Sequence, residues 1–239
     1  MTKCFEGDPQ YIQLVVRIVL EMSDLVVVDV RTQVFVENLL KRSVRLDILA
    51  TDGTGRKINV EIQRSDNGAG RKRARYNSSM MDANLLQKGE YFDDLPETYV
   101  AFVTEHDVIG RGKPLYHIGR YIFDTDEASN DDSHILYVNG EYRDETLLGK
   151  LTHDFSCTDP ADMYYGVLAE RVKFFKDSKE GVAIMCKAME DMRNQAALER
   201  VKAVVYRMLA AGKYSLEEIA DMTELFIDEV KKLKAGQSA

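Results

Sequence analysis

Two short apolar segments in the first third of the chain carry side chains that could do chemistry together. Asp47 lies in the first segment, and Glu61 and Gln63 lie in the second, beyond a turn that contains two glycines. Alternate residues of a strand share one face, so Glu61 and Gln63 point to the same side. A hairpin centred on Thr54 then places Asp47 opposite Glu61. The same register places Arg45 opposite Gln63 on that face.

The opposed carboxylates have a physical consequence of their own. Two carboxylates that face each other across antiparallel strands repel and destabilise the sheet. A cation held between Asp47 and Glu61 removes that penalty, and hard oxygen ligands suit Mg²⁺ or Mn²⁺. The other interpretation is a solvent-facing hairpin edge on which the repulsion is tolerated. Spacing alone leaves both interpretations open.

A run of basic residues follows the second acidic segment. The chain has a formal net charge of −8 and a sequence pI near 5.2, so it repels phosphates at long range. An enzyme that acts on nucleic acid therefore needs a local basic surface. Five basic residues against the single acid Asp66 would supply one, although a solvated helix face explains such a run equally well. The five are Arg64, Arg71, Lys72, Arg73 and Arg75.

The order of these motifs points to a family. Asp47, a hairpin and then Glu61-Ile62-Gln63 are similar to the D…(D/E)-x-K signature of the restriction-endonuclease-like superfamily. Together with further segments, the chain resembles one branch over roughly residues 1–195: the PD-(D/E)XK nuclease family transposases, also called Rpn-type recombination-promoting nucleases. The segments are Ser43–Asp47, Glu61–Asp66, Arg73–Ser79, Leu95–Val100, His134–Gly140, Leu148–Leu151, His153–Phe155 and Asp162–Tyr165.

This resemblance implies a fold and an activity. The fold is α/β, a restriction-endonuclease-like three-layer core with a central mixed β-sheet flanked by helices, plus a helical C-terminal part. The activity is Mg²⁺-dependent hydrolysis of phosphodiester bonds by a DNA endonuclease of a mobile-element or recombination-promoting type. No DDE-type triad is recognisable, so integration chemistry is not expected.

The resemblance also implies roles for individual residues. Asp47 and Glu61 would bind the metal, Mg²⁺ or Mn²⁺, together with the main-chain carbonyl of Ile62. Gln63 stands where the superfamily usually has lysine, and its neutral amide can only donate and accept hydrogen bonds. From the strand register we infer that Arg45 supplies the missing positive charge.

The N-terminus suggests an alternative to an active nuclease. The resembling family usually has additional residues before its first helix, whereas this sequence opens at Met1-Thr2-Lys3-Cys4. The alternative is therefore a catalytically impaired relic that acts as a DNA-binding or protein-interaction module. In either case the helix after Gly70, with Arg71, Lys72, Arg73 and Arg75, is expected to contact DNA phosphates.

Hydrophobic periodicity, together with the residues that end helices and strands, predicts the elements that position these residues. A helix is expected over Pro9–Met22, and the basic helix is expected to run from Gly70 to about Lys88. From Asp162 onward the pattern is helical, with breaks at Gly181 and Gly212, and the acidic end favours packing or a homodimer over DNA reading. The predicted strands are Leu25–Val36, Ser43–Ala50, Ile58–Arg64, Thr98–Thr104, Tyr116–Phe123 and Ser133–Tyr142.

Composition bounds the rest. The chain has 239 residues, 45% of them hydrophobic, which suits a nuclease-like domain over residues 1–160 and a helical region over 161–239. No apolar stretch is long enough to cross a bilayer and no secretory signal is evident, so we expect a cytoplasmic protein without a membrane partner. Cys4, Cys157 and Cys186 lack CxxC spacing and are expected to be buried, reduced thiols. The four histidines also lack ligand spacing, so structural roles are expected for them.

Overall fold

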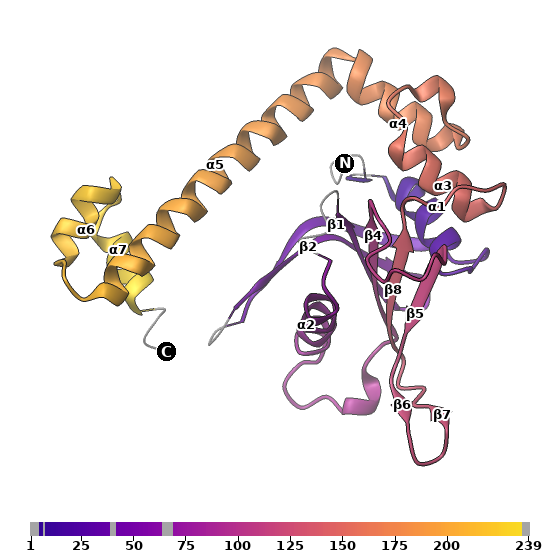
Figure 1. Cartoon of the computed structure of the whole chain (residues 1–239), viewed down its shortest axis with the longest axis horizontal. Helices are drawn as coiled ribbons and strands as arrows, with labels where there is room; N and C mark the ends of the chain where they lie inside the picture. Colours follow the sequence, from indigo (N-terminus) through magenta and orange to yellow (C-terminus); the bar gives the residue numbers. More distant parts are fainter. Residues whose placement is uncertain (1–4, 7, 39–41, 64–68, 236–239) are drawn as a thin grey trace. The chain divides into compact units, whose positions relative to one another are not determined.

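The computed structural model describes residues 5–6, 8–38, 42–63 and 69–235. It divides into two compact units, residues 1–178 and 179–239. The first unit is built on a six-stranded sheet in the order β1-β2-β3-β4-β8-β5 (Figure 1). Its strands are β1 (Val27–Val36), β2 (Val44–Asp52), β3 (Lys57–Gln63), β4 (Thr98–Thr104), β5 (Leu115–Ile118) and β8 (Ser133–Asn139).

The sheet is mixed, as predicted. The strands β1, β2 and β3 pair antiparallel, β3, β4 and β8 pair parallel, and β5 returns antiparallel to β8. Every residue of β4 is buried, which suits a central strand covered on both faces. The β2–β3 turn is fixed by Asp52, whose Oδ1 accepts the N–H groups of Thr54 and Arg56 at 2.9 Å each, and by Gly55 at φ 94°.

Helices cover both faces of this sheet and complete the predicted three layers. Figure 1 shows α2 (Arg71–Asp82) on one face, with α1 (Pro9–Val19), α3 (Leu147–Ser156) and α4 (Gly166–Asp177) on the other. Two core clusters match this division. Ile12 of α1 and Leu151 of α3 pack with Ile48 and Val60, whereas Ala74 and Met81 of α2 pack with Phe102. The 3₁₀ turns Phe92–Asp94 and Pro160–Asp162 lie in the connections.

The second unit is helical. It consists of α5 (Lys179–Ala211), α6 (Leu216–Thr223) and α7 (Ile227–Ala235), which enclose a small core of Val205, Ile219 and Val230. A capping box opens α6, because the Ser215 side chain accepts the Glu218 N–H and the Glu218 side chain accepts the Ser215 N–H. The predicted break at Gly212 is confirmed, with φ 64°.

Several element boundaries differ from the predictions for local reasons. The break expected at Gly181 is wrong: Gly181 lies inside α5, and the chain leaves helical geometry at Ser178. The basic helix ends at Asp82 rather than Lys88, where the Asn84 side chain bonds the Met80 carbonyl and satisfies an end group of the helix. The strand expected over Tyr116–Phe123 is interrupted, and its second part forms a separate ribbon of β6 (Tyr121–Ile122) and β7 (Glu127–Ala128).

Two further expectations meet a different arrangement. The boundary expected at residue 160 falls inside the first unit, because Leu168 of α4 joins the core beneath α1 and Arg171 lies over the ring of Tyr11. The cysteines were expected to be buried, but Cys186 is exposed and Cys157 is half-buried; both are free thiols, and Cys4 lies outside the described residues. Among the described helices, none combines the length and apolarity that crossing a bilayer requires.

Candidate active site

The two predicted acids lie where strands β2 and β3 part. Their antiparallel ladder follows the predicted register as far as the pair Ile48 and Val60. Beyond that pair, β2 continues only beside β1 and β3 only beside β4, so no ladder pair joins Asp47 to Glu61. We call this point the strand fork, meaning Asp47 on one branch and Glu61 and Ile62 on the other.

The side chains of the two acids bridge the strand fork. The Asp47 N–H donates to Glu61 Oε1 at 3.2 Å, and the Ile62 N–H donates to Asp47 Oδ2 at 3.3 Å. Each carboxylate therefore accepts a backbone group of the opposite branch, where a carbonyl would accept in a regular ladder. The structure thus brings Asp47 and Glu61 together, facing each other across the fork.

Glu61 is the more unusual of the two acids, because its side chain is fully buried. Burial raises its pKa, and the nearby charge of Asp47 raises the pKa further. The backbone hydrogen bond from Asp47, the charge of Arg73 and a hydrogen bond from Asn59 act in the opposite direction without cancelling the rise. A buried acid with a raised pKa beside a second carboxylate marks a candidate functional site.

Arg73 provides the counter-charge. Its Nη2 lies 3.0 Å from Glu61 Oε2, and its guanidinium lies 5.9 Å from the centre of the Phe102 ring. The helical spacing explains why this one basic residue turns inward. Arg73 stands one turn before buried Asn77, whereas Arg71 and Arg75 stand one turn apart on an exposed side of α2, with Lys72 also exposed. All four predicted DNA-binding residues of this helix are exposed, and of these four Arg73 is the one that also contacts the buried Glu61.

Gln33 is a site residue that the sequence did not indicate. Its Nε2 donates to Asp47 Oδ1 at 3.2 Å, so both oxygens of Asp47 have a donor. Gln33 has φ 54° in the middle of β1, a left-handed conformation that costs a non-glycine residue roughly 1–3 kcal/mol. Strained residues of this kind concentrate at functional sites. An uncharged residue in an alternating strand carries no sequence signal for either property.

A buried amide contacts Glu61, and further polar groups are buried in the same unit. The Asn59 Nδ2 donates to Glu61 Oε1 at 3.2 Å, and Asn59 is itself fully buried. Within the described residues, Asn59 Oδ1, Asn77 Nδ2 and the Tyr137 hydroxyl are buried without a hydrogen-bond partner. Burial raises the pKa of Tyr137 to about 12, so its hydroxyl stays protonated at neutral pH. Glu61 is thus held by the side-chain amide of Asn59 and the guanidinium of Arg73.

Gln63 and Arg45, two further predicted residues, lie beside the fork. Gln63 pairs with Thr104 of β4, and Arg45 pairs with Phe35 of β1, so the ladder does not place Arg45 opposite Gln63 as expected. The reason is the fork itself, which separates the two strands before that pair. Arg45 is exposed. Arg64 lies outside the described residues.

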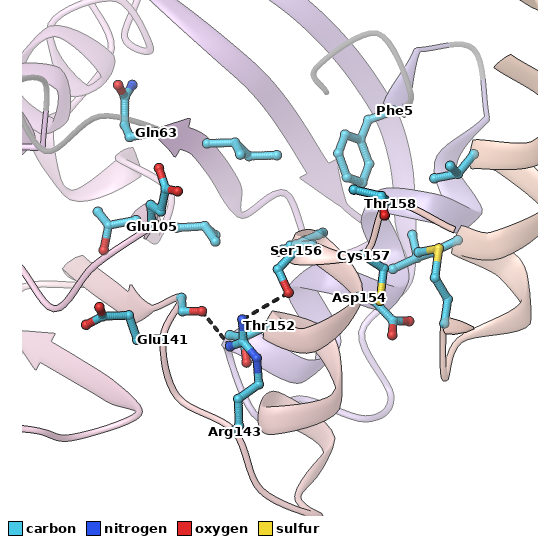
Figure 2. Close-up of a pocket in the computed structure, with 18 of the residues that line it drawn as sticks. Phe5, Gln63, Glu105, Glu141, Arg143, Thr152, Asp154, Ser156, Cys157 and Thr158 are labelled. Atoms are coloured by element: carbon cyan, nitrogen blue, oxygen red, sulfur yellow. Dashed lines mark hydrogen bonds between the residues drawn. The ribbon is translucent and has the colours of Figure 1, made fainter. Parts of the chain in front are cut away.

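A cavity of about 670 Å³ opens at the carboxyl end of the parallel strands, and Ile62 and Gln63 line it. Figure 2 shows Gln63 and Glu105 on one side of this cavity and Phe5, Asp154 and Cys157 on the other. Ligands of α/β sheets commonly bind at the carboxyl ends of parallel strands. The cavity therefore lies where a substrate could reach Gln63.

Comparison with known proteins places a family domain on this site. Residues 27–143 match the family model described as PD-(D/E)XK nuclease family transposase. That segment includes β1 to β4, the strand fork, α2 and β8. No curated protein and no solved structure matches the chain.

Proposed function

Because residues 27–143 form a domain of the PD-(D/E)XK nuclease family transposases, we propose that the chain is a metal-dependent DNA endonuclease. The reaction is hydrolysis of a phosphodiester bond, of a mobile-element or recombination-promoting type. The observation that carries the proposal is the pair of carboxylates bridging the strand fork, one of them fully buried, with a guanidinium at 3.0 Å. A sheet edge that merely tolerated repulsion would expose both acids to water, whereas Glu61 is fully buried.

The donor set fits a hard divalent cation. Asp47 on β2 and Glu61 on β3 offer four carboxylate oxygens, and the Ile62 carbonyl would add a fifth oxygen. Mg²⁺ and Mn²⁺ prefer oxygen ligands of this kind. When bound, such an ion would lower the pKa of a water molecule and neutralise charge on the scissile phosphate.

Neighbouring residues of the chain hold the two carboxylates in position. Gln33 and the Ile62 N–H hold the two oxygens of Asp47, and Asn59 holds Glu61 from the buried side. These hydrogen bonds orient the carboxylates before a ligand arrives. The Gln63 amide can donate to a phosphate oxygen or accept from the attacking water, but it carries no charge.

Arg73 is our candidate for the charge that Gln63 lacks. It is anchored on α2, beside Glu61, and a guanidinium presents several donors to a phosphate. This assignment replaces Arg45, which the fork separates from Gln63. Arg71, Lys72 and Arg75 would bind the DNA backbone without reading its sequence.

One observation favours a second candidate function. Arg73 already neutralises Glu61, so the site can persist without any bound cation. A relic that has lost turnover would keep this ion pair and the exposed basic side of α2. It would then act as a DNA-binding module.

Nicking of supercoiled plasmid tests the proposal. We expect cleavage with Mg²⁺ or Mn²⁺, loss of cleavage with EDTA, and loss in Asp47→Ala and Glu61→Ala. Cleavage that persists in Glu61→Ala would point to a contaminating nuclease. DNA binding without cleavage under any condition would favour the relic.

A further inference from the structure

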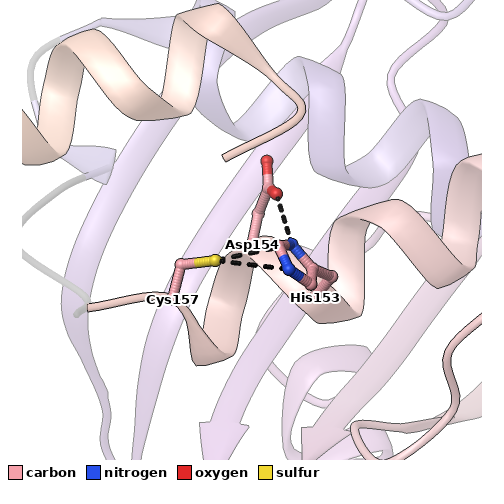
Figure 3. A group of neighbouring side chains, drawn as sticks. All are labelled: His153, Asp154 and Cys157. Atoms are coloured by element: carbon pink, nitrogen blue, oxygen red, sulfur yellow. Dashed lines mark hydrogen bonds and ion pairs between the residues drawn. The ribbon is translucent and has the colours of Figure 1, made fainter. Parts of the chain in front are cut away.

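A second cluster of potential metal ligands lies at the end of α3, apart from the strand fork. Figure 3 shows His153, Asp154 and Cys157, which offer one ligand atom each, all within 4.8 Å of one another. His153 Nδ1 lies 3.4 Å from Cys157 Sγ and 3.3 Å from Asp154 Oδ1. Ligand atoms around a tetrahedral zinc ion are separated by roughly 3.3–3.8 Å, given metal–ligand bonds of about 2.0–2.3 Å.

The local fold brings these three side chains together. His153 and Cys157 are four residues apart on a helix, which puts them on one face, one turn apart. Asp154 is buried, and its two oxygens accept the N–H groups of Tyr164 and Tyr165 at 2.8 Å each. Its carboxylate is therefore fixed in place. Oδ2 keeps a second lone pair open to a ligand, and Oδ1 gains one when an ion replaces its contact with His153 Nδ1.

The electrostatic surroundings suit a cation. Cys157 is the residue that ends α3, where the helix dipole is negative. Burial and the carboxylates of Asp154, Asp162 and Asp159 raise the pKa of the Cys157 thiol, while Arg143 acts in the opposite direction. The same carboxylates attract a cation. The cluster is also reachable, because Asp154 and Cys157 line the cavity of about 670 Å³. Solvent in that cavity can fill a fourth coordination position.

We propose that His153, Asp154 and Cys157 form a binding site for a borderline transition-metal ion of the Zn²⁺ class. One nitrogen, one oxygen and one sulfur ligand suit Zn²⁺ or Co²⁺ rather than Mg²⁺, which prefers oxygen alone. On binding, the Cys157 thiol releases its proton to solvent as the sulfur–metal bond forms, and neutral His153 supplies a lone pair. The ion would join His153 and Cys157 to Asp154, whose oxygens already accept the N–H groups of Tyr164 and Tyr165 before α4. This proposal does not depend on the proposed nuclease activity.

Cobalt substitution tests the site directly. Co²⁺ added to the full chain should give a thiolate charge-transfer absorption at one ion per chain, and Zn²⁺ should abolish it by displacement. Cys157→Ser should remove the band and weaken Zn²⁺ binding by more than about tenfold. Cys186→Ser is the matched thiol control and should leave both unchanged, since Cys186 is exposed on α5. A band that survives in Cys157→Ser, or no band in the wild type, would overturn the proposal.

A second measurement covers the case in which Cys157→Ser does not fold. In the wild type, Zn²⁺ should slow alkylation of Cys157, mapped by peptide mass spectrometry, while alkylation of Cys186 stays constant. Equal alkylation of Cys157 with and without Zn²⁺ would overturn the proposal. His153→Gln should abolish the protection, and His117→Gln, which alters a histidine in contact with His134, should not. Protection lost in His117→Gln instead would assign the ion to that pair and count against the cluster.

The two metal proposals fail separately. Asp47→Ala should lose Mg²⁺-dependent nicking yet keep the cobalt band. A band that disappears in Asp47→Ala would show that cobalt binding depends on the strand fork, and the cluster at the end of α3 would be rejected as an independent site.

Discussion

The Arg73 guanidinium lies 3.0 Å from the carboxylate of Glu61, so a helix that presents basic residues to solvent also sends one of them into the buried acidic site. Breaking a buried ion pair by removing one partner is strongly destabilising, because the other charge is left uncompensated. Here the buried partner is Glu61, and Arg73 keeps part of its side chain exposed. The pair links the expected DNA-binding surface to the expected metal ligands.

Metal binding should stabilise the fold. Mg²⁺ or Mn²⁺ that binds only the native state raises the free energy of unfolding, by about 2.7 kcal/mol at a hundred times Kd. Asp47→Asn should remove this increment, and it should stabilise the metal-free protein because it removes the charge that opposes ionisation of Glu61. Thermal unfolding with and without metal provides the measurement. Asp93→Asn, at an exposed acid, is the control; an equal metal shift in Asp47→Asn would contradict the site.

The raised pKa of Glu61 should appear in the pH dependence of stability. The unfolded chain loses this proton near the ordinary value of 4.5, whereas the native protein holds it to higher pH. Between those two values the native state binds more protons, so the stability of the metal-free protein from this group falls as pH rises. The slope is at most about 1.4 kcal/mol per pH unit for one proton.

Glu61→Gln should flatten that part of the curve, measured by urea unfolding from pH 4 upward. Mg²⁺ affinity in the wild type should rise over the same window, because the metal competes with the proton. Glu141→Gln serves as the control, since hydrogen bonds from His106 and Asp107 lower the pKa of Glu141 instead. Identical pH profiles for wild type and Glu61→Gln would show that Glu61 is not the group concerned.

Arg73 and Arg75 should differ in kind although both belong to α2. Arg73→Gln removes the charge beside Glu61, so we expect cleavage at saturating DNA to fall on the order of a hundredfold. Arg75→Gln should weaken DNA binding and reduce the salt slope by about 1, with cleavage at saturating DNA unchanged. Single-turnover nicking and binding titrations at several salt concentrations separate the two effects. Equal losses of affinity in both variants, with equal cleavage, would reduce Arg73 to a surface residue.

Gln63 should act through hydrogen bonds alone. Gln63→Ala removes its orienting amide and should lower Mg²⁺-dependent nicking on the order of a hundredfold. Gln63→Lys restores the residue that the superfamily usually carries and should preserve or raise nicking. If both variants cleave as well as the wild type, Gln63 has no catalytic role. If neither they nor the wild type cleaves while all bind DNA, the relic is supported.

The sequence predicts the parts of this molecule that depend on local order. Alternation and turn chemistry predict β4 with its observed bounds, and they predict the β2–β3 register up to Ile48 and Val60. The approach of the Glu61 side chain to Asp47 follows from that register, although no ladder pair joins the two residues. These features repeat every two residues along one strand, which a pattern can capture.

The unpredicted features depend on contacts between distant segments. No pattern in β1 announces the left-handed Gln33, because its conformation follows from the geometry beside Asp47. The parting of β2 and β3 is decided by their other neighbours, so the sequence could not place Arg45 away from Gln63. The inward turn of Arg73 was accessible in principle, from its spacing to buried Asn77. The four-residue spacing of His153 and Cys157 was also readable, but only the folded chain adds Asp154 to it.

At the strand fork, the two acids also supply the hydrogen bonds that hold β2 to β3. The amides of Asp47 and Ile62 are held by carboxylates instead of carbonyls, so their protection depends on the charge of those groups. A bound ion that attracts the carboxylates weakens these two hydrogen bonds. Without an ion, the two bonds stay formed. Amide hydrogen exchange at Asp47 and Ile62 therefore reports occupancy of the site without DNA and without turnover. The two side chains that connect β2 to β3 beyond the last ladder pair are therefore the same two that would bind the ion.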